Sequence, residues 1–188
     1  MEEFEVKFLK INVAEIESKL TALGAKKEFD KIYKRKTFDH PDMSLNKMGA
    51  YLRLRDEGDK VTMAYKRRLG MKEGKNDAGL EEIEITVSDF EKTAQIILKT
   101  GLVEKFYEEN RRIRYILGDS TFDIDFWPLL DPFLEIEGKS WDEVEKGIAL
   151  LGLNSADKKI FPAIEVYRLN GLEELDYKIL TFEQQVKR

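Results

Sequence analysis

The stretch Glu3-Phe4-Glu5-Val6-Lys7, close to the start of the chain, alternates charged and apolar side chains. Successive side chains of a β-strand point to opposite faces, so this stretch predicts a strand with one charged face and one apolar face. The apolar face would pack in a hydrophobic core. The charged face of a single strand of this kind would ordinarily meet solvent.

The same alternation recurs in five later segments of the chain. Each has two charged side chains two residues apart, and the segments are 52–55, 82–84, 112–114, 123–125 and 135–137. A sheet that closes on itself has an interior, and charges buried there need partners because an unpaired buried charge is very costly. The repetition therefore predicts that these strands line a charged cavity.

Length and composition bound the class of protein. The chain has 188 residues, which is typical of one domain, and we expect residues 1–188 to form one. It has no cysteine, which excludes disulfides and thiolate metal sites. No apolar run approaches the roughly 18 residues of a membrane span, and the first predicted strand begins too close to Met1 for a signal segment. We therefore expect a cytoplasmic protein that does not bind membranes.

The charge pattern excludes further classes. The net charge is −5, from 32 basic and 37 acidic side chains, and neither sign forms long blocks, so we expect no nucleic-acid partner. His40 is the only histidine and lies between Asp39 and Pro41 in a turn-like stretch. This position indicates an exposed loop residue, which removes histidine-based zinc chemistry and a Ser-His-Asp triad.

Turn residues and apolar periodicity predict the elements that carry these charges. We expect eight strands, mostly joined as hairpins, at roughly residues 3–11, 33–36, 50–56, 60–69, 82–87, 111–114, 120–127 and 132–139. Antiparallel strands in this number can curl into a barrel, so the predicted fold is α+β, an eight-stranded antiparallel tunnel with flanking helices. We expect this tunnel to occupy residues 1–139.

Capping residues predict three helices outside the tunnel. One helix is expected after Asn12, one after Ser88 with Glu91 in a capping box, and one after Ser140 with Glu143 in a second capping box. We expect the apolar segment 140–188 to be helical and to pack against the barrel or over one mouth. The polar loop 70–79 is interpreted as an exposed hairpin loop, with a lid over the cavity as the alternative.

The predicted lining contains eight acidic and six basic side chains. The acids are Glu3, Glu5, Glu82, Glu84, Asp123, Asp125, Glu135 and Glu137, and the bases are Lys7, Arg53, Arg55, Lys66, Arg112 and Arg114. Their sum is negative, and about two divalent cations would reverse its sign, so that a triphosphate of charge about −4 would be attracted. Oxygen ligands without histidine or cysteine favour Mg²⁺ or Mn²⁺, and arginine can bind phosphate oxygens in a bidentate manner.

The order of these motifs along the chain resembles that of a known family. The series begins with the Glu-x-Glu-x-Lys of residues 3–7, continues with the Arg-x-Arg of residues 53–55 and Lys66, and ends with the acidic residues 135–137. This series, from Glu3 to about Gly138, resembles the CYTH domain, or triphosphate tunnel metalloenzymes. That family includes class IV adenylyl cyclases, thiamine triphosphatases and inorganic triphosphatases.

The resemblance implies a role for each group of residues. In this family, carboxylates bind the metal ions and bases bind the triphosphate. The implied metal ligands are Glu3, Glu5, Asp125, Glu135 and Glu137, and the implied phosphate-binding residues are Lys7, Arg53, Arg55, Lys66, Arg112 and Arg114. The other lining residues are Glu82, Glu84 and Asp123, of which Asp123 could pair with Arg112 or Arg114.

Three functions are compatible with these residues. The first is metal-dependent hydrolysis of a phosphoanhydride in a triphosphate, in which Lys66 would either orient the attacking water or bind phosphate. The second is an adenylyl cyclase that converts ATP to cyclic AMP and pyrophosphate. The third is a non-enzymatic module that binds nucleotide or polyphosphate, which the large number of carboxylates disfavours. We expect the protein to act as a monomer or homodimer.

Overall fold

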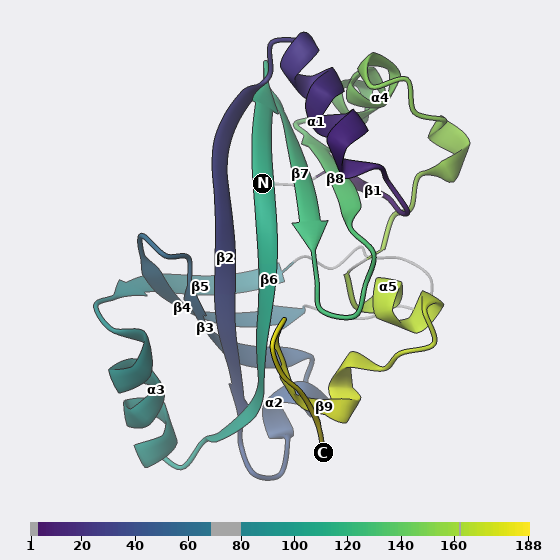
Figure 1. Cartoon of the computed structure of the whole chain (residues 1–188). Helices are drawn as coiled ribbons and strands as arrows, with labels where there is room; N and C mark the ends of the chain where they lie inside the picture. The colour runs from purple at the N-terminus through teal and green to yellow at the C-terminus, as the bar shows by residue number, and fades with distance from the viewer. Residues whose placement is uncertain (1–3, 69–79, 162) are drawn as a thin grey trace. The chain divides into compact units, whose positions relative to one another are not determined.

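The computed structural model of the chain describes residues 4–68, 80–161 and 163–188 (Figure 1). Its strands form one sheet of ten. They are β1 (Phe4–Phe8), β2 (Lys26–Asp39), β3 (Ala50–Asp56), β4 (Val61–Arg68), β5 (Leu80–Val87), β6 (Val103–Leu117), β7 (Ser120–Phe126), β8 (Phe133–Gly138), β9 (Tyr177–Leu180) and β10 (Gln185–Lys187). The helices are α1 (Val13–Ala22), α2 (Ser44–Lys47), α3 (Phe90–Lys99), α4 (Trp141–Leu150) and α5 (Ala163–Leu169).

The main path of the sheet runs in the order β1-β8-β7-β6-β2-β3-β4-β5. Its registered neighbours are antiparallel, as in the pairing of β3 with β4 and of β7 with β8. The prediction of an α+β fold built on an antiparallel sheet with flanking helices is confirmed. Among the described strands, the path begins at β1 and ends at β5, so pairing between these two strands does not close the sheet.

The chain forms two compact units, which we call unit 1 and unit 2. Unit 1 comprises Met1–Lys31 and Asn110–Glu174, and unit 2 comprises Ile32–Glu109 and Leu175–Arg188. The strands β2 and β6 are the longest, with 14 and 15 residues, and each contributes residues to both units. Each unit also has a hydrophobic cluster of its own.

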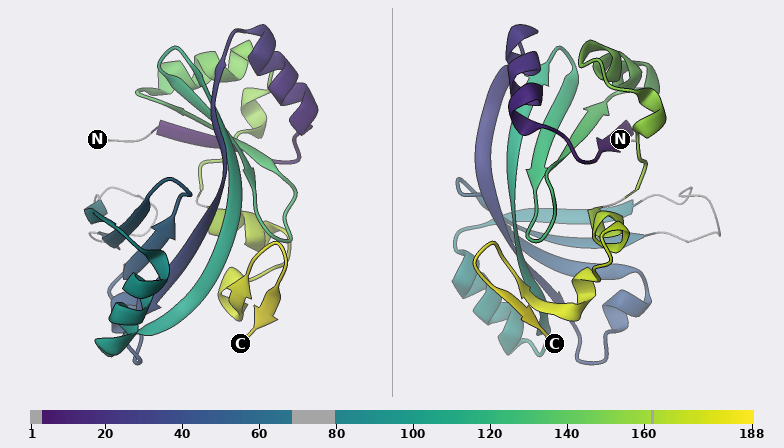
Figure 2. Two further views of the ribbon diagram at one scale, coloured as in Figure 1. Left: turned by 60° about the vertical axis from the view of Figure 1, so that its left-hand side comes forward. Right: turned by 45° about the vertical axis from the view of Figure 1, so that its right-hand side comes forward.

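The core of unit 1 forms between its strands and the helices α1 and α4, which lie on the same side of them (Figure 2). The strands contribute the side chains that alternate with the charged ones, such as Val6 on β1, Ile124 on β7 and Ile136 on β8, all fully buried. Helix α4 approaches closely at Gly147, where a Cβ atom would lie 3.0 Å from Cγ2 of Ile136. The apolar face predicted for β1 is therefore confirmed.

The core of unit 2 forms between α3 and the strands β2 and β3. Phe38 and Leu54 of these strands are fully buried, and they pack with Phe90, Ala94 and Ile97 of the helix. The three helical residues recur at spacings of four and three, which places them on one face of α3. In this unit, too, the charged residues of β3 alternate with those that pack in the core.

The predicted helix starts hold with one correction. Asn12 caps α1 by accepting a hydrogen bond from the N–H of Glu15, and Ser140 caps α4 by accepting one from the N–H of Glu143. At α3, the cap is Asp89 rather than Ser88, since the Asp89 carboxylate accepts from the N–H of Lys92 at 2.8 Å. Both residue types are good caps, so the sequence alone favoured the wrong one of two neighbours.

The segment 140–188 is only partly helical. It contains α4 and α5 as predicted, together with two short 3₁₀ helices, Ser155–Asp157 and Glu174–Asp176. The hairpin β9–β10 then follows, and β9 pairs in parallel with β6 through Tyr107 and Ile179. These two strands were not predicted, and they raise the sheet from the expected eight strands to ten.

The position of the α3 cap can be tested by substitution. We expect Asp89→Ala to lower the free energy of unfolding clearly more than Ser88→Ala does, because the N–H of Lys92 loses its acceptor. Ser88→Ala is the matched control, and it should change stability by less than about 0.5 kcal/mol. Urea unfolding of both variants would measure this, and a larger loss for Ser88→Ala would contradict the assigned cap.

Candidate active site

In unit 1, the charged face of the sheet begins with the pair β1 and β8. Glu5 lies opposite Glu137, and Lys7 lies opposite Glu135, in the antiparallel register of these strands. The Lys7 side chain is only 2% exposed; its ammonium group donates a hydrogen bond to Glu5 and lies 3.0 Å from Oε1 of Glu135. Lys7 therefore neutralises carboxylates of both strands.

The face continues on β7 and β6. Asp123 lies opposite Glu135 on one side and Arg114 on the other, and Asp125 lies opposite Arg112. Arg112 donates from Nε and Nη2 to the two oxygens of Asp125 at 2.7 and 2.5 Å, from Nη1 to Asp123 at 2.8 Å, and from Nη2 to Glu135 at 2.6 Å. Arg114 donates to both oxygens of Asp123, at 2.7 and 2.6 Å.

Burial is the largest single influence on the pKa of Asp125 and on that of Glu135. Burial raises the pKa of Asp125 to about 7, with the neighbouring charges of Glu135 and Asp123 acting in the same direction and Arg112 opposing them. Burial also acts to raise the pKa of Glu135, but Arg112 and Lys7 outweigh it and hold that pKa below its usual value. The two buried acids thus differ in how fully the bases compensate their charge.

The carboxylates of this face have the chemistry of a site for a hard divalent cation. Five of them, counting Glu5 and Glu137, share the face with three bases, which leaves a surplus of negative charge. All the donors are oxygens, and an oxygen that accepts one hydrogen bond keeps a further lone pair. In the part of the chain that the structure describes, no three acidic side chains converge as a ready metal site. Glu3 lies outside the described residues.

In unit 2, two arginines of β3 differ from those of unit 1 in their partners. The nearest oxygen of Glu84 lies 3.7 Å from Arg53 and 3.9 Å from Arg55, beyond hydrogen-bond distance. Within the described ranges, the buried Nε atoms of Arg53 and Arg55 have no hydrogen-bond partner. Burial and the charge of Arg55 both lower the pKa of Arg53. Arg53, whose nearest acid is Glu84, is therefore poorly compensated, and Arg55 keeps an Nε donor free of hydrogen bonds among the described residues.

Lys66 lies on β4 opposite Glu82 of β5. Its ammonium group is 2.8 Å from Oε1 of Glu82, and the next pair on the same face of these strands is Ala64 with Glu84. The structure thus brings together the predicted residues of β3, β4 and β5 on one face of unit 2. Glu82 and Glu84 act there as counter-ions to the bases.

Four residues of unit 2 extend this face and were missing from the predicted site. Arg35 of β2 lies opposite Arg55, and both guanidinium groups lie over the ring of Tyr33, at 5.7 and 5.8 Å from its centroid. Glu108 lies 3.7 Å from Arg35, and Glu57 lies 2.5 Å from Arg55. Tyr33, Arg35 and Thr37 alternate along β2, and this alternation could have indicated the face. Residues 33–36 are one aromatic and three basic side chains in a row, however, so the period of two was hard to see.

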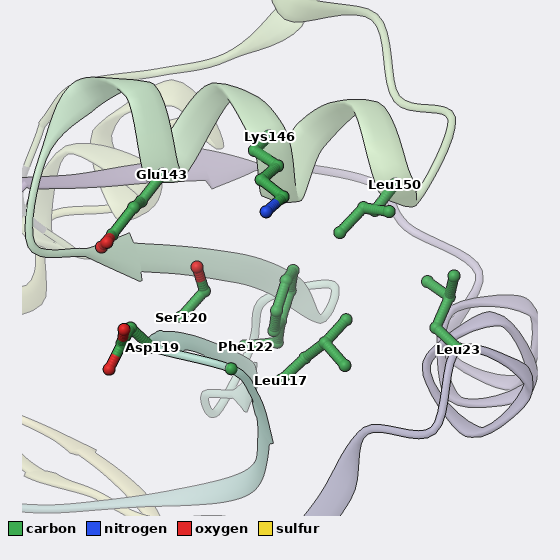
Figure 3. A pocket seen from close by; sticks show the side chains of 10 residues that line it. Leu23, Leu117, Asp119, Ser120, Phe122, Glu143, Lys146 and Leu150 are labelled. Carbon is green, nitrogen blue, oxygen red and sulfur yellow. The ribbon is translucent and has the colours of Figure 1, made fainter.

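A pocket of about 430 Å³ lies elsewhere in unit 1, between α4 and the turn that joins β6 to β7 (Figure 3). Leu117, Phe122 and Leu150 form its apolar part, and Lys146 and Asp119 lie at its polar part. None of the predicted site residues lines it. Since Phe122 alternates with Asp123 along β7, the pocket and the charged face belong to opposite faces of the strand.

The predicted residues therefore fall into two sets. The unit 1 set holds most of the predicted metal ligands with Lys7, Arg112 and Arg114, and the unit 2 set holds Arg53, Arg55 and Lys66 with their counter-ions. Asp123 pairs with both Arg112 and Arg114, as the sequence suggested it could. The loop 70–79, considered as a lid, lies outside the described residues. In the ranges described, no helix is long and apolar enough to span a bilayer.

Solved structures with similar folds come from several organisms. The PH1012 protein of Pyrococcus horikoshii OT3 is 25% identical with a TM-score of 0.65, and the match covers 88% of this chain and 99% of that one. A Vibrio parahaemolyticus protein assigned as an adenylate cyclase is 15% identical with a TM-score of 0.67, covering 87% and 96%.

A third similar structure is HpAC1 from Hippeastrum, a protein assigned as an adenylyl cyclase and described as having a dominant triphosphatase activity. It is 17% identical with a TM-score of 0.63, and the match covers 94% of this chain and 99% of that one. No curated protein matches the chain.

The model of the CYTH domain matches residues 1–159, which include the charged strands of both units. This range contains every residue of the two sets described above. The family resemblance of the charged motifs is thereby confirmed. The chain belongs to the CYTH domain family.

Proposed function

We propose that this protein is a metal-dependent enzyme that hydrolyses a phosphoanhydride bond of a triphosphate. The observation that carries the proposal is the state of the β3 arginines. Arg53 and Arg55 are partly buried and lie two residues apart on one face of β3. Arg55 pairs with Glu57, but among the described residues both arginines leave Nε donors without hydrogen-bond partners, and the nearest acid to Arg53 is 3.7 Å away. Buried guanidinium groups in this state favour an anion with several oxygens, and a triphosphate is such an anion.

The bases would bind and orient the substrate. Arg53 and Arg55 would donate to phosphate oxygens, and Lys66, next to Glu82, would either hold the attacking water or bind a further phosphate oxygen. In the reaction, the water oxygen bonds to phosphorus, the bond from phosphorus to the bridging oxygen breaks, and a proton of the water is released. Positioning and charge neutralisation supply most of the catalysis in phosphoryl transfer.

The carboxylates of unit 1 would hold the metal. Glu5, Glu135 and Glu137 lie together across β1 and β8, and Glu3 is a further ligand predicted from the sequence alone. A bound Mg²⁺ or Mn²⁺ would neutralise part of the phosphate charge and would stabilise the leaving oxygen. The surplus of carboxylates argues against a module that only binds anions, because such a module needs bases and gains nothing from acids.

One assay decides between hydrolysis and cyclisation. Purified protein is incubated with inorganic triphosphate, ATP or thiamine triphosphate in the presence of Mg²⁺ or Mn²⁺, and the products are separated. Release of phosphate supports the proposal, and the favoured substrate identifies the group on the triphosphate. Cyclic AMP with pyrophosphate would assign the chain as an adenylyl cyclase instead. No turnover of any of the three would contradict an enzymatic role.

The metal requirement gives the first prediction for activity. We expect no turnover in excess chelator and full recovery when Mg²⁺ or Mn²⁺ is added, because the carboxylates alone should repel a triphosphate. Phosphate release at each metal concentration measures this. Turnover that persists in the chelator would remove the metal from the mechanism.

The carboxylates can be tested through Glu137. We expect Glu137→Gln to weaken Mn²⁺ binding by about tenfold or more, because the amide keeps the size of the side chain but removes the charge of a ligand. Glu15→Gln, on the exposed surface of α1, is the control and should leave the affinity unchanged. Calorimetric titration and thermal melting separate the two effects: unchanged Mn²⁺ affinity with a much lower melting temperature would mean that Glu137 is structural.

The arginines can be tested through Arg53. Lysine at this position keeps the charge but loses the planar fork, so we expect kcat/KM for triphosphate to fall about tenfold or more in Arg53→Lys. Arg67→Lys is the matched control, since Arg67 is exposed on the next strand and alternates away from Lys66. Steady-state kinetics of both variants provide the measurement. An Arg53→Lys enzyme with normal kcat/KM would show that Arg53 only neutralises Glu84.

A further inference from the structure

Arg112 is the residue whose contacts depart most from a phosphate-binding role. Its guanidinium group makes four hydrogen bonds, to Asp125, Asp123 and Glu135, at distances of 2.5 to 2.8 Å. A guanidinium group has about five N–H donors, so these bonds use nearly all of them. A phosphate could be bound by Arg112 only if one or more of these carboxylates were displaced.

The partners of Arg112 are themselves buried. The side chains of Asp125 and Asp123 are 0% and 3% exposed, and the side chain of Glu135 is 11% exposed. Removing a base from three buried carboxylates would leave their charges uncompensated, at a large cost in free energy. The cluster of Arg112 and its three carboxylates is therefore more stable intact than it would be with Arg112 turned toward a substrate.

Within this cluster, Asp125 and Glu135 differ in how their side chains are held in place. Both oxygens of Asp125 accept from Arg112, in the bidentate geometry that fixes an arginine most strongly. Glu135 accepts from Arg112 through Oε2 and lies next to Lys7 through Oε1, so its orientation is set from two sides. Asp125 thus anchors the guanidinium group, and the guanidinium group orients Glu135.

We propose that Arg112, anchored by Asp125, is a positioning residue that orients Glu135 for the divalent cation and does not bind phosphate. This inference rests on the proposed function, because it concerns the metal ion which that function requires. It divides the arginines by role: those of β3 bind the substrate, and Arg112 of β6 holds the metal ligands. Groups that orient metal ligands typically change metal affinity by about 10- to 100-fold when they are altered.

The test measures metal and phosphate binding separately in substrate-free protein. We expect Arg112→Lys, which keeps the charge but cannot hold three carboxylates, to weaken Mn²⁺ binding about tenfold or more, as measured from the electron paramagnetic resonance signal of free Mn²⁺. Affinity for imidotriphosphate, a triphosphate that is not hydrolysed, measured by calorimetry at saturating Mg²⁺, should stay within about twofold of wild type. Arg53→Lys should show the opposite pattern.

Arg111→Lys is the matched control. Arg111 is the preceding residue of β6, donates to both oxygens of Asp30 at 2.7 Å, and lies on the other face of the strand. The Arg111→Lys substitution removes a bidentate arginine–carboxylate pair of the same kind but leaves the charged face of β6 unchanged. The affinity for Mn²⁺ should therefore not change. If Arg111→Lys and Arg112→Lys lost Mn²⁺ affinity equally, the cause would be a general destabilisation of the fold and not the positioning of Glu135. That result would overturn the proposal.

The remaining outcomes are also decisive. If Arg112→Lys binds Mn²⁺ as the wild type does, whether or not it loses triphosphate affinity, Arg112 is not a positioning residue, while the proposed function is unaffected. If the wild type itself binds no Mn²⁺, the metal requirement and this inference fail together. If Arg112→Lys does not fold, the assigned Nε–H resonance of Arg112 in wild-type protein gives the answer: it should shift with Mg²⁺ and not with triphosphate alone, and the reverse would overturn the proposal.

Discussion

The structure depends on one constraint, which is that strands with a charged face must give every buried charge a partner. Lys7 illustrates this constraint: it follows Val6 of the core directly, yet its own side chain is almost fully buried on the other face. Only the carboxylates of Glu5 and Glu135 make that position tolerable for an ammonium group. The amino-acid sequence of the charged faces is therefore constrained as closely as that of the hydrophobic core on the opposite side of the same strands.

The two units meet this constraint differently. In unit 1, acids outnumber bases and the guanidinium group of Arg112 is saturated with carboxylates. In unit 2, the β3 arginines have acids nearby but lack hydrogen bonds at Nε among the residues described. Under the proposed function, the first arrangement would bind a cation and the second a polyanion.

Much of this arrangement could be predicted from the sequence, because the period of two in a strand fixes which residues share a face. That period placed Asp123 with the other lining residues before any strand neighbour was known. Asp123 was predicted as a possible partner of Arg112, but Asp125 and Glu135 were not, since the arginine side chain reaches acids on two other strands and the register decides which ones. The hairpin β9–β10 was missed because its strands, of four and three residues, are too short to show a period.

The interleaving of the two units has a consequence for how the protein is made. Each unit combines an early and a late segment of the chain, and the last segment of unit 2, Leu175–Arg188, is synthesised after all of unit 1. Neither unit can be complete on the ribosome until most of the chain has emerged. Any single cut between residues 32 and 109 also leaves both fragments with strands whose neighbours lie on the other piece. The protein is thus expected to resist division into separately expressed halves.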